Sequence, residues 1–231
     1  MIFKQLFDTK SSTYTYIVSS GKGREALIID PVIENTDEYI KVLKNLDLKL
    51  VKVIDTHIHA DHITGLNELN KRTNCIRIMG KESKSEVIDL RIKDNEKINI
   101  ENIELKAIYT PGHTDCSYSF LMNDRVFTGD TLLINTTGRT DFQTGNSYDS
   151  YESLFNKLLK LPEKTLVYPA HDYNEKKCST IENERSNNPR LQVSSKEEYA
   201  EIMDNLNLVN PKMMDVAVPA NIKGFTLDQV N

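Results

Sequence analysis

The chain has 231 residues and a formal net charge of −5, and this length is sufficient for a sizeable hydrophobic core. This length predicts a single domain over residues 1–231. Apolar residues make up 39% and charged residues 27% of the chain, as in globular proteins. The acidic balance, without a basic run, argues against a nucleic-acid partner. No apolar run is long enough to span a bilayer and no basic patch predicts membrane binding, so we expect no membrane partner.

The three cysteines, Cys75, Cys116 and Cys178, form neither a CxxC pair nor a disulfide framework. The first residues lack the charged start and long apolar middle of a signal peptide. Both observations predict a reducing compartment, which is the cytoplasm, or an organelle matrix if a leader has been removed.

The N-terminal part alternates short apolar strands with two amphipathic helices. Strands are predicted over residues 1–7, 14–20, 25–30 and 50–56, and helices over 35–48 and 62–72. Thr36 is a candidate N-cap of the first helix.

The remainder repeats the order of strands followed by helices. Strands are predicted over residues 75–80, 97–110, 118–124, 125–130 and 164–173, and helices over 148–162, 178–189 and 195–206. In both halves the polar side chains that could bind a ligand come just after strands, where sheets present their functional loops.

The segment "THIHADHITG" carries three histidines and an aspartate between residues 57 and 62. A chain leaving a strand in extended form projects His57 and His59 to the same side, while Asp61 continues that face and His62 opens the next helix. A lone histidine is more often a structural residue than a ligand. Neutral imidazole and carboxylate are common ligands of zinc and iron, so the whole cluster indicates a metal site.

The two other histidines also follow predicted strands. His113 lies in "YTPGHTD" and His171 in "YPAHDY", and "FTGD" places Asp130 at the end of another strand. Gly129 would let the backbone approach closely there. An isolated aspartate at such a position is often a turn residue. Beside five histidines placed in this way, Asp130 is better interpreted as a ligand.

The strings "THIHADH", "GHT", "TGD" and "AHD" resemble the metallo-β-lactamase superfamily in order and context. The resemblance implies a fold of the α/β (α+β) class, an αββα sandwich in which two mixed β-sheets are flanked by helices. The strings "THIHADHITG", "FTGDTLLI", "GRTDFQTG", "YPAHDY", "NPRL" and "AVPANIKG" together resemble the persulfide dioxygenases, the ETHE-type branch. This resemblance spans about residues 3–224.

Hydrolases of the superfamily, such as glyoxalase II, bind two metals, and this chain has every residue that they need. A dinuclear zinc site would turn a shared water into hydroxide for thioester hydrolysis. One metal would take His57, His59, His113 and Asp130, and the other Asp61, His62, His171 and the bridging Asp130. The histidine motif alone does not exclude this alternative.

The dioxygenase resemblance implies one Fe(II) per chain, held by the catalytic residues His57, His113 and Asp130. Two imidazoles and one carboxylate leave three coordination positions open, as an oxygenase requires. The implied reaction oxidises glutathione persulfide with O2 to sulfite and glutathione, and the family implies a homodimer. In this reading the other polar residues orient the ligands and bound water by hydrogen bonding. They are His59, Asp61, His62 and His171.

The resemblance also implies a glutathione pocket lined by Arg139, Tyr173 and Arg190. Arginine is suited to bind the carboxylates of glutathione, although most arginines form ordinary surface ion pairs. One departure from the family pattern is the string "HTDCS", in which Asp115 and Cys116 alter a loop beside the site. Packing is the simplest role for Cys116.

We therefore predict an iron-dependent persulfide dioxygenase, with the glyoxalase II-like hydrolase as the alternative. Hydrolases of that type usually add a helical, basic C-terminal domain, whereas the tail of this chain is short and acidic. A non-catalytic metal-binding module is a third possibility. It is the weakest, because structural sites usually have a closed ligand set.

Overall fold

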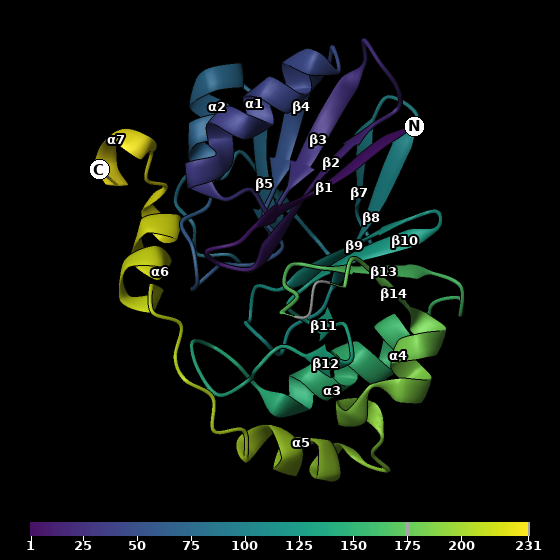
Figure 1. Ribbon diagram of the computed structural model, residues 1–231. Helices are drawn as coiled ribbons and strands as arrows, with labels where there is room; N and C mark the ends of the chain where they lie inside the picture. Colours follow the sequence, from purple (N-terminus) through teal and green to yellow (C-terminus); the bar gives the residue numbers. More distant parts are fainter. Residues whose placement is uncertain (174–175, 231) are drawn as a thin grey trace.

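The computed structural model describes residues 1–173 and 176–230. Two six-stranded mixed sheets pack face to face, with helices on the outer face of each (Figure 1). The αββα sandwich implied by the sequence motifs is therefore confirmed.

The first sheet has the strand order β1-β2-β3-β4-β5-β6. Strands β1 to β3 are antiparallel, and β3 to β6 are parallel. Its strands are β1 (Ile2–Asp8), β2 (Thr13–Ser19), β3 (Glu25–Ile29), β4 (Lys49–Ile54), β5 (Ile76–Gly80) and β6 (Leu90–Ile92). Helices α1 (Thr36–Asn45) and α2 (Leu66–Thr73) cover its outer face (Figure 1).

The second sheet has the order β14-β13-β10-β9-β8-β7, in which only β10 and β13 pair in parallel. Its strands are β7 (Lys97–Ile100), β8 (Ile103–Tyr109), β9 (Tyr118–Met122), β10 (Arg125–Gly129), β13 (Leu166–Pro169) and β14 (Ser179–Thr180). A small ribbon pairs β11 (Leu132–Leu133) with β12 (Thr136–Thr137). Helices α3 (Ser147–Asn156), α4 (Ile181–Asn187) and α5 (Lys196–Asp204) pack on this half.

Side chains from both sheets form the central core. Tyr16, Leu27, Ile54, Phe120 and Phe127 are fully or almost fully buried there. The two sheets are also joined at one edge, where the Tyr16 hydroxyl donates to Pro169 O and Tyr14 N donates to Ala170 O at 2.7 Å. This join brings the loop that follows β13 against the start of β2.

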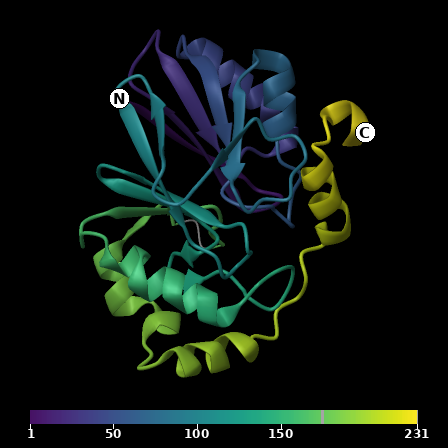
Figure 2. The ribbon, with the colours of Figure 1, turned by 180° about the vertical axis from the view of Figure 1, so that it is seen from behind.

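Two helices that the sequence pattern did not predict end the chain. After α5 the chain leaves the second helical layer and returns to the first half as α6 (Met214–Lys223) and α7 (Leu227–Val230), as Figure 2 shows from behind. Helix α6 contains Pro219, which argues against a helix in a sequence pattern. Within the described ranges, none of the helices is long and apolar enough to cross a membrane.

Most of the predicted elements are confirmed, but several bounds are wrong and the shortest strands were missed. Thr36 is the first residue of α1 and not its N-cap, the strand predicted over 164–173 ends at Pro169, and the helix predicted over 178–189 begins only after β14. The helix predicted over 62–72 begins only at Leu66, so the expectation that His62 opens it is wrong. The short strands β6, β11, β12 and β14 were not predicted, because two or three residues carry no periodicity.

The buried carboxylate of Glu184 organises the chain around β11 and β12. Its Oε2 accepts from Asn135 N at 2.9 Å and from Asn188 Nδ2 at 2.8 Å, while Oε1 accepts from the Ser179 hydroxyl and Asn183 Nδ2. Asn188 in turn donates to Thr136 O at 2.9 Å. The segment that follows Asp130 is therefore held by α4.

We expect Glu184→Ala to lower the free energy of unfolding by about 2–3 kcal/mol, because buried donors lose their acceptor. Urea denaturation followed by circular dichroism measures this loss. Glu182→Ala, which changes an exposed residue of the same helix, is the matched control and should stay within about 0.5 kcal/mol. Equal losses for the two variants would contradict the role assigned to Glu184.

Candidate metal centre

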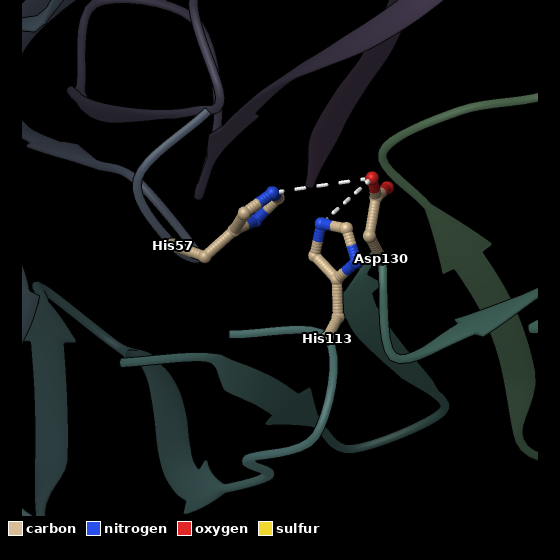
Figure 3. A group of neighbouring side chains, drawn as sticks. All are labelled: His57, His113 and Asp130. Carbon is tan, nitrogen blue, oxygen red and sulfur yellow. Dashed lines mark ion pairs between the residues drawn. The ribbon is translucent and has the colours of Figure 1, made fainter. Parts of the chain in front are cut away.

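Loops at one edge of the sandwich bring three predicted ligands together. His57 follows β4, His113 follows β8 and Asp130 directly follows β10. Asp130 Oδ2 lies 3.9 Å from His57 Nε2 and 3.6 Å from His113 Nε2 (Figure 3). Atoms that bind one ion at about 2 Å lie about 3–4 Å apart, so this spacing fits a shared metal.

The tautomers of the two histidines follow from their other ring nitrogens. The single proton of the Thr56 hydroxyl is donated to Asp30 Oδ2 at 3.0 Å, so Thr56 Oγ1 accepts from His57 Nδ1 at 2.9 Å. His113 Nδ1 donates to the carbonyl oxygen of Arg139 at 2.8 Å. In the neutral form, each ring therefore presents Nε2 to Asp130 without a proton, as metal binding requires.

The charge states match this arrangement. Burial, together with the neighbouring His59, holds the pKa of His57 well below its usual value, so its ring is neutral at pH 7. Burial alone would raise the pKa of Asp130, but His171, His113 and His57 outweigh it and lower the pKa well below its usual value. A neutral imidazole and an ionised carboxylate are the forms that bind a metal.

The other oxygen of Asp130 is used within the protein. Asp130 Oδ1 accepts from His171 Nδ1 at 2.7 Å, and Asp61 Oδ2 accepts from His171 Nε2 at 2.8 Å. Burial would lower the pKa of His171, but the two carboxylates raise it well above its usual value. His171 is therefore an imidazolium between two carboxylates, and it donates through both ring nitrogens.

His59 and His62 lie on the histidine loop, residues 55–64, which runs outside the helices and strands apart from a single bridge at Thr64. The rings of His57 and His59 are 4.3 Å apart, as their spacing predicted, although His59 Nε2 turns to Asp30 Oδ1 at 3.3 Å. Among the described residues, two buried side-chain atoms lack a hydrogen-bond partner, and they are His59 Nδ1 and His62 Nε2. Together with Asp61, these histidines form a second group with metal-ligand spacing.

The three residues predicted to bind glutathione lie in different surroundings. The Arg139 guanidinium forms a bidentate pair with Asp141 at 2.6 and 2.7 Å and donates to Val209 O at 2.8 Å. Arg190 donates to Thr137 O at 2.6 Å. Tyr173 is 72% exposed, and its ring stacks on His171 with the centroids 6.2 Å apart.

Sequence reasoning missed the groups that orient the ligands. Asp30 ends a strand in the same way as Asp130, so the rule that found Asp130 could have found it. Thr56 is next to His57, and Gly129 has a φ of +52° with an added Cβ only 2.6 Å from Thr56 Oγ1. The expected close approach at Gly129 is therefore confirmed.

Cys116 is buried, and burial raises the pKa of its thiol, which fits the predicted packing role.

Comparison with known proteins agrees with this geometry. The sequence model of the metallo-beta-lactamase superfamily matches residues 8–171. Persulfide dioxygenase ETHE1, mitochondrial, of Mus musculus is 42% identical over 226 residues, which cover 96% of this chain and 88% of that protein. Hydroxyacylglutathione hydrolase of Dictyostelium discoideum is 34% identical over 190 residues, which cover 75% of this chain and 68% of that protein.

Among solved structures, the crystal structure of ETHE1 from Myxococcus xanthus has a TM-score of 0.94 and 45% identity, and the match covers 96% of this chain and 98% of that chain. The fold and the site thus define a protein of the metallo-β-lactamase superfamily. Within that superfamily the chain belongs to the persulfide dioxygenases of the ETHE1 type, to which its identity and coverage exceed those to the hydrolase.

We expect Thr56→Val to weaken metal binding about 10- to 100-fold, because His57 Nδ1 loses its acceptor and the ring its fixed orientation. Thr56→Ser keeps the hydroxyl and should bind metal within about twofold of the original chain. Competition with a chromophoric chelator under anaerobic conditions measures both affinities. Equally weak binding by the serine variant would show that the methyl group, not the hydroxyl, is what matters.

Proposed function

We propose that the chain is an Fe(II)-dependent persulfide dioxygenase that converts glutathione persulfide, O2 and water into sulfite and glutathione. One Fe(II) per chain would be held by His57, His113 and Asp130. The names of the ETHE1 relatives support the reaction. A donor set of two neutral imidazoles and one carboxylate supports iron, since it is the set used by non-haem Fe(II) oxygenases.

The observation that carries the proposal is that the two oxygens of the Asp130 carboxylate have different partners. Oδ2 faces His57 and His113, whereas Oδ1 is hydrogen-bonded to His171. In a two-metal site the second ion would also bind His171, and that ligation would need a free ring nitrogen. Both nitrogens of His171 donate to carboxylates, so the arrangement supports a single metal.

Bound Fe(II) would supply open coordination positions for O2 and substrate, and the persulfide sulfur would supply the electrons that reduce O2. The protein holds the ligands in the right protonation states through Thr56 and the Arg139 carbonyl. The rings of Phe142 and His113 are in T-shaped contact, with centroids 5.9 Å apart. The imidazolium of His171 keeps a proton beside Asp130 while leaving its Oδ2 free.

For the substrate we propose that Tyr173, Arg139 and Arg190 line the glutathione pocket. Tyr173 is exposed beside His171 and is open to a ligand. Arg139 would bind a glutathione carboxylate in exchange for Asp141, and Arg190 in exchange for the Thr137 carbonyl. We also propose a homodimer in a reducing compartment, where the unpaired Cys75, Cys116 and Cys178 remain thiols.

The second candidate function is a dinuclear thioester hydrolase. It is favoured by the two unpartnered nitrogens, His59 Nδ1 and His62 Nε2, which a second ion could use. The similarity to hydroxyacylglutathione hydrolase also points to it. The hydrogen bonds of His171 oppose it, because a second metal would have to replace a proton that His171 now donates to a carboxylate.

We expect the Fe(II)-loaded protein to consume O2 with glutathione persulfide, and Asp130→Ala to reduce this rate to background because the carboxylate ligand is lost. An oxygen electrode measures uptake, and ion chromatography measures sulfite. Asp215→Ala, at an exposed position of α6, is the control and should keep the full rate.

The same preparations should be tested with S-lactoylglutathione after loading with either Fe(II) or Zn(II). Rapid hydrolysis of this thioester, without O2 uptake on glutathione persulfide, would overturn the dioxygenase proposal in favour of the hydrolase.

A further inference from the structure

The side-chain amide of Asn221, in α6, is buried against the histidine loop. Its Nδ2 donates to His59 O and to His62 O, each at 3.0 Å. Its Oδ1 accepts from Thr64 N at 2.9 Å. One side chain thus satisfies three main-chain groups of the segment that carries four of the metal-centre residues, although more than 150 positions separate them in sequence.

These bonds use both N–H groups of the Asn221 side chain. A carboxamide has two N–H groups, and each meets one carbonyl. The histidine loop lies outside the regular elements, so its buried main-chain groups need partners from side chains. Substitution of Asn221 would leave the carbonyls of His59 and His62 without these donors.

Main-chain contacts fix the place of α6 next to Asn221. The Ser85 hydroxyl donates to Asn221 O at 3.2 Å, and Glu86 N donates to Ile222 O at 2.7 Å. Gly224 ends the helix with a φ of +71°, and an added Cβ there would lie 2.4 Å from Val87. The carboxamide is therefore presented from a helix anchored to residues 85–87.

Apolar contacts fix the same helix against both ends of the histidine loop. Ala217 and Ala220 pack with Ile33 and Ile63. On another side, Ile222 packs against a cluster that contains Ile58. Helix α6 thus packs on the histidine loop on both sides of residues 59–62, and these contacts hold the helix in place.

Asp61 lies between the two carbonyls that Asn221 binds. Its carboxylate accepts from His62 Nδ1 and from His171 Nε2, both at 2.8 Å. His171 in turn fixes Oδ1 of Asp130 at 2.7 Å. The turn at residues 59–62 therefore sets the position of Asp61, and through it the oxygen that Asp130 presents to His57 and His113.

We propose that Asn221 is a positioning residue for the metal centre: by holding the carbonyls of His59 and His62 it fixes the Asp61–His171–Asp130 chain. The inference rests on the proposed metal site at His57, His113 and Asp130. It does not depend on the metal being iron or on the substrate being a persulfide.

The test compares Asn221→Asp and Asn221→Ala with the original chain. The aspartate keeps the shape but replaces the two donors by an oxygen facing two carbonyls, and the alanine removes all three bonds without adding charge. We expect both to weaken Fe(II) binding at least about tenfold, as loss of a group that orients ligands does. We also expect a shift in the visible absorption of the Co(II)-loaded protein.

Leu158→Ala is the control for lost stability, because it removes a fully buried side chain from a core cluster that contains no residue of the histidine loop or of α6. Urea denaturation measures the free energy of unfolding of every variant, so that loss of stability can be separated from loss of metal binding. We expect Leu158→Ala to keep the original affinity and spectrum despite its loss of stability. If only the aspartate variant fails to fold, the alanine variant provides the comparison.

Three outcomes are distinguishable. Original affinity and spectrum in both Asn221 variants would overturn the inference, and so would an equal loss of metal binding in Leu158→Ala. Failure of the unaltered chain to bind Fe(II) or Co(II) would instead refute the metal site on which the proposed function depends.

Discussion

The proposed metal centre depends on one interaction, the hydrogen bond between His171 Nδ1 and Asp130 Oδ1 at 2.7 Å. It leaves one carboxylate oxygen of Asp130 for His57 and His113. The same ring donates to Asp61 through its other nitrogen, so the positive charge of His171 is compensated on both sides. In the proposed function, a superfamily scaffold that can hold two metals is in this way arranged around one. The number of bound metals would decide the chemistry, since a single ion with open coordination positions suits an oxygenase and a bridged pair suits a hydrolase.

The charges around this interaction are deeply buried, and each has a partner. His59 is held by Asp30 and Asp55, which raise its pKa to about 9 although burial lowers it. Burial raises the pKa of Asp55 to about 7 despite the nearby His59. Asp30 also receives the Thr56 N–H at 2.7 Å. Buried ion pairs of this kind contribute little net stability, but removal of one partner is costly because it leaves an uncompensated buried charge.

Much of the fold and of the ligand set could be predicted from the sequence. The strands of the sandwich show clear apolar patterns, and the polar residues that end them, such as His113 and Asp130, lie at one edge because the strands end there. The supporting contacts could not be predicted. The bonds of Asn221 join residues more than 150 positions apart and follow from tertiary packing, which leaves no local signal. Arg139 was predicted from its motif, but sequence could not show that Asp141 occupies its guanidinium.

Anaerobic titration of the metal-free protein with Fe(II), followed by spectroscopy of the iron, tests the central claim most directly. One oxygen of Asp130 is bonded to His171, and the other faces His57 and His113. We therefore expect saturation at one equivalent of Fe(II) per chain, with the spectrum of an isolated high-spin ion. Saturation at two equivalents, with magnetic coupling between the ions, would mean that Asp130 bridges a pair and would contradict the account.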